Sequence, residues 1–216
     1  TKRHDPPHII LLPEIKFDEG KFINHVKKFV NQTGYCVVVA SEGIRDKSGD
    51  FLSDTGVTDA FGHKQLGGVA PILAQKITDI GLKNHWSVAD YLQRSARHIA
   101  SKTDLEQAYA VGVHAVNLAI TGKTALMPII KRLNDDPYKW KISEVPLKDV
   151  ANVEKTLPRE FISKNGFEIT AAGRRYLSPL IQGEPPTTFS KGLLDIAILK
   201  NTLVKRKLSK FLRDTH

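Results

Sequence analysis

The chain has 216 residues, 41% of them apolar, and a formal net charge of +9, a length and composition that allow a substantial buried core. No apolar run approaches the roughly 18 residues that span a membrane, and the polar start of the chain predicts no secretory signal. The single cysteine, Cys36, cannot form an internal disulfide, so we expect a cytoplasmic protein without a membrane partner and a buried, unreactive thiol.

The net positive charge indicates an anionic partner, which is either nucleic acid or a phosphorylated metabolite. Part of the excess lies in the C-terminal tail, where five Lys and Arg residues fall between positions 205 and 213. Apart from this charge, the sequence has no RNA-binding aromatic motif, no zinc-ligand spacing and no basic-zipper heptads. We therefore expect the tail to be a solvated surface segment and the partner not to be nucleic acid.

The first elements predicted along the chain form a β–α–β unit. An apolar run at residues 8–12 predicts a strand that ends where a proline precedes Glu14. Asp18 caps the following helix, whose apolar residues recur on one face at helical spacing, and Gly34 ends it. A continuous β-branched run at 35–40 predicts a second strand that is covered on both faces. We expect the two strands to be parallel and joined by a right-handed crossover.

The middle of the chain continues this alternation. Residues 41–66 are polar and rich in Gly and Asp, which predicts a long loop at a strand end, a usual place for binding residues. Two glycines then open a helix at 67–81, and residues 86–89 predict the next strand. The segment 101–119 predicts a long helix that is nearly free of charge after its first turns and is therefore buried on most sides. Residues 124–130 predict another strand.

Beyond residue 133 the pattern weakens, because prolines divide the sequence into short pieces. We predict short helices and turns that wrap the main domain. The expected organisation is an α/β domain at 1–133 followed by a C-terminal extension at 134–216, which ends in the basic tail. The first strand follows almost directly on Thr1, so the chain reads as a segment that begins within a longer protein.

Polar residues that follow the predicted strands are candidates for a binding site. Glu14 could accept hydrogen bonds from sugar hydroxyls, or it could be a helix-capping or surface acid. The Ser-Glu-Gly sequence at 41–43 could line the same crevice or simply form the turn. His63 and Lys64 precede a helix N-terminus, which favours anions, although the glycine pair at that turn needs no ligand.

The most informative stretch contains Tyr91 and Arg94, with Arg97 and His98 just beyond them. A phosphate group is bound by charged N–H forks and a phenolic donor, with small neighbours that allow close approach. The alternative is a surface arginine cluster that pairs with neighbouring acids. The chemistry of these residues does not by itself decide between a phosphate site and a surface cluster.

Motifs that would carry a reaction are absent from the sequence. It contains no P-loop, no G-x-G-x-x-G, no H-E-x-x-H and no G-x-S-x-G. The Gly-Lys-Thr sequence at 122–124 lacks the upstream glycine and the following helix of a P-loop. The sequence therefore has the features of a binding half without an obvious reacting half.

The order of these elements resembles the C-terminal half of phosphofructokinases, in particular of the bacterial pyrophosphate-dependent members. The resemblance covers about residues 8–185 and follows four stretches: HIILLPE, VVVASEGIRDKSGDFL, GHKQLGGVAPILAQKI and the long segment that begins VADYLQRSARHIASKTDLEQ. Tyr-Leu-Gln-Arg at 91–94, with the small-residue helix after it, is the most specific part. The resemblance implies an α/β fold with a three-layer, mostly parallel sheet and helices on both faces.

The resemblance also implies roles for four residues. Glu14 matches the glutamate that binds the sugar of fructose 6-phosphate, and Tyr91 and Arg94 match the residues that contact the 6-phosphate. His85 replaces a phosphate-binding arginine of ATP-using relatives and is a secondary candidate. Those relatives have His and Gly-Gly where this chain has Tyr91 and the Ser-Ala pair at 95–96, which favours the pyrophosphate-dependent branch.

The implied activity is transfer of a phosphoryl group from pyrophosphate to the 1-hydroxyl of fructose 6-phosphate, a glycolytic reaction that gives fructose 1,6-bisphosphate. The catalytic aspartate and the Mg²⁺ site of the family belong to the N-terminal half, so this chain would contain no catalytic residue and would position the acceptor. The expected partners are the N-terminal half of the same polypeptide and further copies in a homo-oligomer. The alternatives are an ATP-dependent phosphofructokinase and a non-catalytic sugar-phosphate-binding or regulatory module of the same fold.

Overall fold

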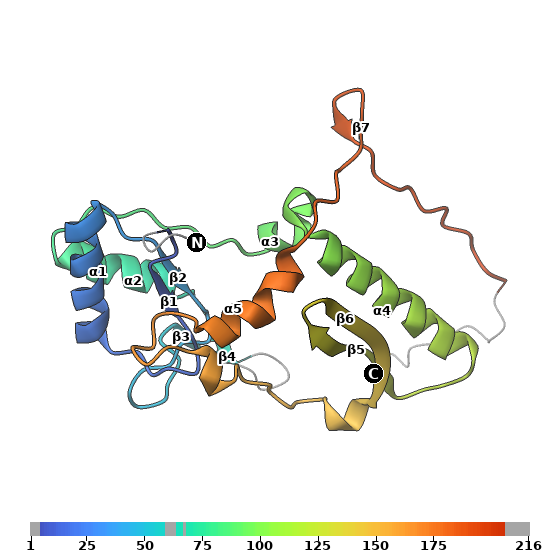
Figure 1. The fold of residues 1–216 in the computed structure, drawn as a ribbon, viewed down its shortest axis with the longest axis horizontal. Helices are drawn as coiled ribbons and strands as arrows, with labels where there is room; N and C mark the ends of the chain where they lie inside the picture. The colour runs from blue at the N-terminus through green and yellow to red at the C-terminus, as the bar shows by residue number, and fades with distance from the viewer. Residues whose placement is uncertain (1–4, 59–63, 67, 206–216) are drawn as a thin grey trace, which may run out of the picture. The chain divides into compact units, whose positions relative to one another are not determined.

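The computed structural model of the chain describes residues 5–58, 64–66 and 68–205. These residues fall into two compact units, one within 1–185 and the other within 186–216. In chain order, the helices and strands of the first unit are β1 (Ile9–Leu11), α1 (Glu19–Thr33), β2 (Val38–Ala40), β3 (Asp54–Thr58), β4 (Lys64–Leu66), α2 (Ala70–Asp79), α3 (Leu92–Ser95), α4 (Lys102–Ile120), β5 (Leu126–Asp135), β6 (Tyr138–Pro146) and α5 (Ala171–Leu177) (Figure 1). The second unit contains β7 (Phe189–Ser190) and β8 (Leu193–Leu194). Among the described residues, none of the helices combines the length and apolar character needed to cross a bilayer.

The predicted β–α–β unit is confirmed at the start of the chain. Strands β1 and β2 pair in parallel, with Ile9 opposite Val38. Helix α1 begins where the Asp18 side chain accepts a hydrogen bond from the backbone N–H of Lys21 over 3.1 Å. It ends at Gly34, whose φ of 82° lies in the left-handed region that glycine adopts without strain. The helix boundaries therefore follow from local capping chemistry.

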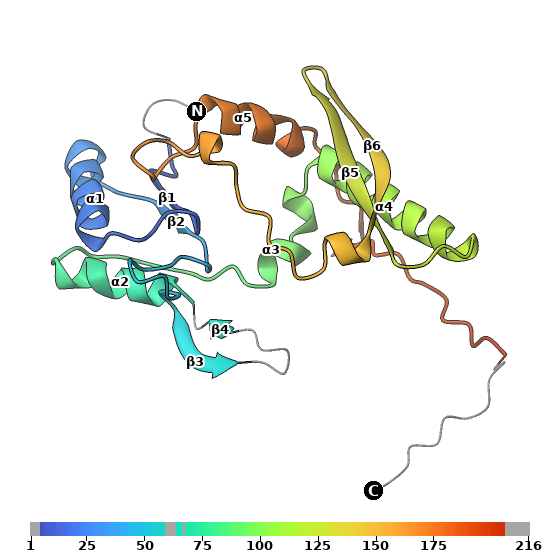
Figure 2. The same cartoon turned by 90° about the horizontal axis from the view of Figure 1, so that it is seen from below.

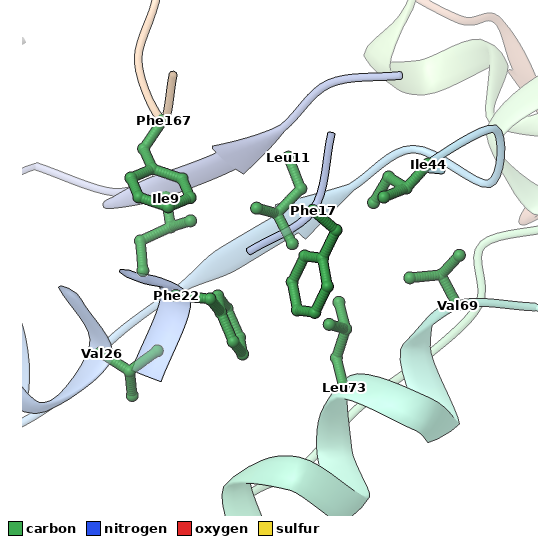
Figure 3. Packing of buried hydrophobic residues seen from close by; sticks show 9 residues of the cluster. All are labelled: Ile9, Leu11, Phe17, Phe22, Val26, Ile44, Val69, Leu73 and Phe167. Carbon is green, nitrogen blue, oxygen red and sulfur yellow. The ribbon is translucent and has the colours of Figure 1, made fainter. Parts of the chain in front are cut away.

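The hydrophobic core lies between the β1–β2 pair and helices α1 and α2 (Figure 3). Its fully or nearly fully buried members are Ile9, Leu11, Phe17, Phe22, Val26, Ile44, Val69, Leu73 and Phe167. Phe167 comes from a segment far along the chain, and its backbone oxygen accepts a hydrogen bond from Ile10 N over 2.8 Å. The late segment thus completes a core that begins in the first strand.

The sheet differs from the expected three-layer, mostly parallel arrangement. In the part of the chain that the structure describes, β1–β2 is the only parallel pair, and β3–β4, β5–β6 and β7–β8 are separate antiparallel pairs. The predicted strand at 86–89 is wrong, since these residues form no strand and Trp86 and Val88 are more than half exposed. A segment of strand-like composition becomes a strand only where a neighbouring backbone supplies hydrogen bonds, and β2 is bonded to β1 alone among the described strands.

Two hairpins occupy regions where the sequence predicts loops or short pieces. Strands β3 and β4 pair within the predicted loop at 41–66. The predicted strand at 124–130 is confirmed as β5, and the strand that pairs with it, β6, was missed. Pro137 lies in the connection between β5 and β6, and Pro146 ends β6, so these prolines bound the hairpin instead of breaking it. The predicted division at residues 133 and 134 stays a prediction, and β5 crosses it.

The long helix predicted at 101–119 is present as α4, but its predicted burial on most sides is wrong. Of its residues, Gln107 and Leu118 are buried, whereas Tyr109 and Ile120 are about three-quarters exposed. Figures 1 and 2 show α4 lying along the β5–β6 hairpin, which covers one side of the helix. The absence of charge on α4 therefore does not reflect burial within the described chain.

Candidate functional site

A groove of about 1290 Å³ lies beside β2. One wall consists of β2 and the loop that follows it, and others come from one face of α1 and from α2. Residues 34–36, the segment 82–91 and Arg94 also line the groove. The groove therefore gathers the end of a parallel strand and the segment with the phosphate-binding chemistry in one place, as expected for a ligand site in an α/β fold.

Tyr91 and Arg94 lie together on the wall of this groove. Tyr91 immediately precedes the single turn of α3, and the Arg94 guanidinium lies 5.4 Å from the centre of the Tyr91 ring. Residues three apart share one face of a helical turn, which explains this proximity. Tyr91 is 69% exposed, and within the described chain Arg94 forms no ion pair. The predicted pair is thus together and open to a ligand.

The other basic residues of this stretch differ in their surroundings. His85 is exposed and lines the same groove as Tyr91 and Arg94. Arg97 instead donates a hydrogen bond from Nη1 to the backbone oxygen of Pro185 over 3.0 Å, and neither Arg97 nor His98 lines the groove. The structure therefore separates His85 from the two residues that the sequence left unassigned.

Glu14 does not lie on this groove. Its Oε1 accepts a hydrogen bond from the backbone N–H of Leu157 over 2.7 Å. Its Oε2 is buried and has no hydrogen-bond partner among the described residues. The structure therefore does not bring Glu14 together with Tyr91 and Arg94, although it leaves one carboxylate oxygen without a described partner.

Glu42 lines the groove with Tyr91 and Arg94, as does Asp90. Glu42 lies two residues beyond the end of β2 and is exposed. Sequence reasoning noted the turn at 41–43 but assigned the sugar to Glu14. The signal for Glu42 was its place after the second strand of the parallel pair, since carboxyl ends of parallel strands face the ligand crevice.

The other features noted in the sequence are His63, Lys64, the basic tail and Cys36. His63 lies outside the described residues, as does the tail from residue 206, and Lys64 lies in β4. Burial raises the pKa of Cys36 to about 11, so this thiol is protonated at neutral pH and is not a nucleophile. The described chain contains no group of three or more His, Cys, Asp or Glu side chains that could hold a metal ion.

Comparison with known proteins gives the family. No family model matches the chain. A protein of Halomonas elongata named pyrophosphate–fructose 6-phosphate 1-phosphotransferase is 57% identical over 208 residues, which are 96% of this chain and 50% of the relative. A protein of Xanthomonas campestris with the same name is 54% identical over 207 residues, 94% of this chain and 50% of the relative. The chain belongs to the phosphofructokinase family. The crystal structure of a pyrophosphate-dependent phosphofructokinase from Marinobacter aquaeolei agrees, with a TM-score of 0.78 and 49% identity over 97% of this chain and 49% of that one.

The resemblance inferred from the sequence is confirmed by these matches. The chain spans about half the length of the curated relatives it matches, and it corresponds to the C-terminal half of a pyrophosphate-dependent phosphofructokinase. The α/β fold class is that of the phosphofructokinases with solved structures.

Proposed function

We propose that this chain is the fructose 6-phosphate-binding half of a phosphotransferase that uses pyrophosphate to make fructose 1,6-bisphosphate in glycolysis. The observation that carries this proposal is the placement of Tyr91 together with Arg94, which forms no ion pair among the described residues, on the wall of one groove. The chain also resembles, at 57% identity, a protein named for this reaction. A guanidinium beside a phenol supplies the charged and neutral donors that a phosphomonoester accepts.

The proposed roles follow the positions of the side chains. Arg94 and Tyr91 would donate hydrogen bonds to the 6-phosphate, and His85, on the same groove, would be a further donor. The carboxylate that accepts from the sugar hydroxyls is Glu14 by family resemblance, with Glu42 as the residue that lines the groove. Each such charge-assisted bond contributes about 1.5–3 kcal/mol, so the two donors together support a phosphate site of useful affinity.

The reaction itself would be completed by polypeptide that corresponds to the N-terminal half of the relatives. In this proposal that half supplies the aspartate base and the Mg²⁺ that neutralises charge during phosphoryl transfer. The described residues contain no group of His, Cys, Asp or Glu side chains that fits a metal ion. This chain binds the acceptor and orients its 1-hydroxyl, which removes the entropic cost of bringing donor and acceptor together.

The proposal includes the domain organisation of the chain, its sheet, its oligomeric state and its location in the cell. The chain would consist of the substrate-binding domain at 1–133 and the extension at 134–216, with the β5–β6 hairpin crossing between them. In the assembled protein, the β1–β2 pair would belong to a three-layer, mostly parallel sheet. The protein would act in the cytoplasm as a homo-oligomer.

Reconstitution tests the function directly. The 216-residue chain is coexpressed with the half of the Halomonas elongata relative that it does not match, and formation of fructose 1,6-bisphosphate is measured with pyrophosphate or with ATP. We expect turnover with pyrophosphate for the combined halves and none for either half alone. The intact Halomonas elongata protein is the positive control. Turnover with ATP alone would indicate an ATP-dependent enzyme, and substrate binding without turnover from either donor would indicate a non-catalytic module.

A further inference from the structure

Helix α4 presents a row of large apolar side chains to solvent. The row consists of Tyr109, Val113, Val116 and Ile120, which we call the α4 stripe, and their exposed fractions range from 44% to 76%. The spacing of four, three and four residues places them on one face of the helix. At 1.5 Å per residue the stripe is about 16 Å long, which is long enough to receive a helix or the face of a sheet.

The side of α4 that faces the rest of the chain is a different one. Gln107 donates from Nε2 to the hydroxyl of Tyr138 over 2.6 Å, His114 Nε2 lies 3.1 Å from Glu144 Oε1, and Leu118 is 6% exposed. Each of these three α4 residues is two positions before a member of the stripe, and two positions correspond to about 200° around a helix. The stripe therefore points away from the β5–β6 hairpin.

The composition of α4 does not suit a face in water. No Asp, Glu, Lys or Arg occurs between residues 107 and 120, whereas the solvent face of a surface helix is normally charged or polar. Contiguous exposed apolar residues mark interaction sites in soluble proteins. The composition of α4 thus suits contact on two sides of the helix, and the described chain covers only the side that faces the β5–β6 hairpin.

Gly112 gives a second, independent indication. It lies in the middle of α4, where glycine is less favourable than alanine. A Cβ added at Gly112 would meet no atom of the described chain within 4 Å. No contact in this structure therefore requires a glycine, and the usual remaining reason is close approach of another backbone. The neighbouring exposed residues are also small, namely Ala108, Ala115 and Ala119.

We propose that the α4 stripe, with Gly112 at its edge, is the surface on which the other half of the polypeptide docks. The occupant is argued from length, because relatives at up to 57% identity contain about as many residues again as this chain. An interface within one chain benefits from a high effective concentration and need not be self-complementary, unlike a contact between two copies. This inference rests on the proposed function, since both require the same second half.

Binding of that half to variants of the stripe tests the proposal. The chain is coexpressed with the tagged, unmatched half of the Halomonas elongata relative, and the amount retained on the tag is measured. Val116→Asp places a charge in the contact and should lower the retained fraction about tenfold or more. The matched control is Val153→Asp, which changes a 64% exposed valine outside α4 and should be retained like the wild type.

A second variant, Gly112→Ala, distinguishes loss of binding from loss of folding. In the chain alone it should raise the Tm by about 2–4 °C, because alanine favours the helix and nothing is displaced. In the coexpression it should lower retention, because the added methyl separates the backbones. A variant that is more stable yet binds less is not expected from a merely structural position. Equal retention of Gly112→Ala, Val116→Asp and wild type would overturn the proposal.

The mass of the isolated chain in solution shows whether a second copy of the chain, instead of the other half, covers the stripe. A mass of 24.0 kDa in solution supports the proposal, whereas a dimer that dissociates in Val116→Asp would show that a second copy covers the stripe and would overturn it. The two proposals also fail separately. If Val116→Asp lowers binding but the combined halves show no turnover, the proposed function is refuted and the docking surface is supported. If the combined halves show turnover but the stripe variants bind like the wild type, the docking surface is refuted and the function is supported.

Discussion

The backbone N–H of Leu157 donates a hydrogen bond to the Glu14 carboxylate over 2.7 Å, and so joins the end of β1 to a segment near the end of the first unit. This contact gives Glu14 a structural task that needs no ligand. Glu42, by contrast, lines the groove that also contains Tyr91 and Arg94. The two acids that end the parallel strands are therefore expected to respond differently to substitution.

Paired substitutions distinguish these acids. Glu14→Ala should lower the free energy of unfolding by about 1–3 kcal/mol, because the partly buried N–H of Leu157 loses its acceptor. Glu42→Ala should leave the unfolding free energy nearly unchanged and weaken fructose 6-phosphate binding about tenfold. Urea denaturation and calorimetric titration of the reconstituted protein measure the two effects. A loss of substrate affinity in Glu14→Ala without loss of stability would instead return the sugar contact to Glu14.

Arg94→Ala should weaken fructose 6-phosphate binding by about 1.5–3 kcal/mol, or roughly ten- to a hundredfold, because a charge-assisted hydrogen bond to the phosphate is lost. Pyrophosphate affinity should hardly change, since the donor site is proposed to lie in the other half. Arg97→Ala is the matched control, because Arg97 is occupied with the backbone oxygen of Pro185 and lies off the groove. Unchanged affinity in Arg94→Ala would mean that Arg94 is a surface residue.

Glu144 should make the docking of α4 on the hairpin sensitive to acid. The hydrogen bond with His114, helped by Lys123, lowers the pKa of the Glu144 carboxyl below its ordinary value of 4.5. A lowered folded-state pKa contributes stability that is present above the ordinary value and is lost as the pH falls through the lowered one. Glu144→Gln should therefore cost more thermal stability at about pH 7 than at about pH 3.

A second glutamate provides the control for that experiment. Glu106 forms an exposed ion pair with Lys102, 3.8 Å apart, and such pairs contribute little to stability. Glu106→Gln should thus change the Tm only slightly at either pH. If Glu144→Gln costs the same at both pH values, the carboxylate does not act through the contact with His114.

Cys36 should react slowly with alkylating reagents. Burial raises its pKa to about 11, and the thiolate is the reacting form. Iodoacetamide at about pH 8 should therefore modify the folded chain roughly a hundredfold more slowly than the urea-unfolded chain. The experiment needs no variant, because the chain has one cysteine. Equal rates in the two states would show that the residues just before β2 are not packed as described.

The parts of the fold that could be predicted are those decided by neighbours in the sequence. Asp18 and Gly34 bound α1 through contacts within a few residues, and the i, i+3 spacing brings Tyr91 and Arg94 together. The segment 86–89 has the composition of a strand but not a neighbouring strand to pair with in the described chain. The orientation of α4 likewise depends on what lies on each side, which composition cannot specify.

The candidate site shows the same division between local and distant effects. That acids end both parallel strands could be predicted, but which acid lines the groove could not. The difference comes from Leu157, which is 143 residues from Glu14 in the sequence and engages that carboxylate. A contact of this separation leaves no local pattern, so only the folded chain distinguishes Glu14 from Glu42.

The closure of β1 by Phe167 has a consequence for how the chain is made. Ile10 donates to the Phe167 backbone, and the Phe167 ring belongs to the core with Ile9. At about 5–20 residues per second, a ribosome needs roughly 8 to 30 s to reach Phe167 after Ile10. During that time β1 has an open edge and its core lacks one aromatic ring. The nascent chain therefore passes through an interval in which pairing with other chains competes with folding.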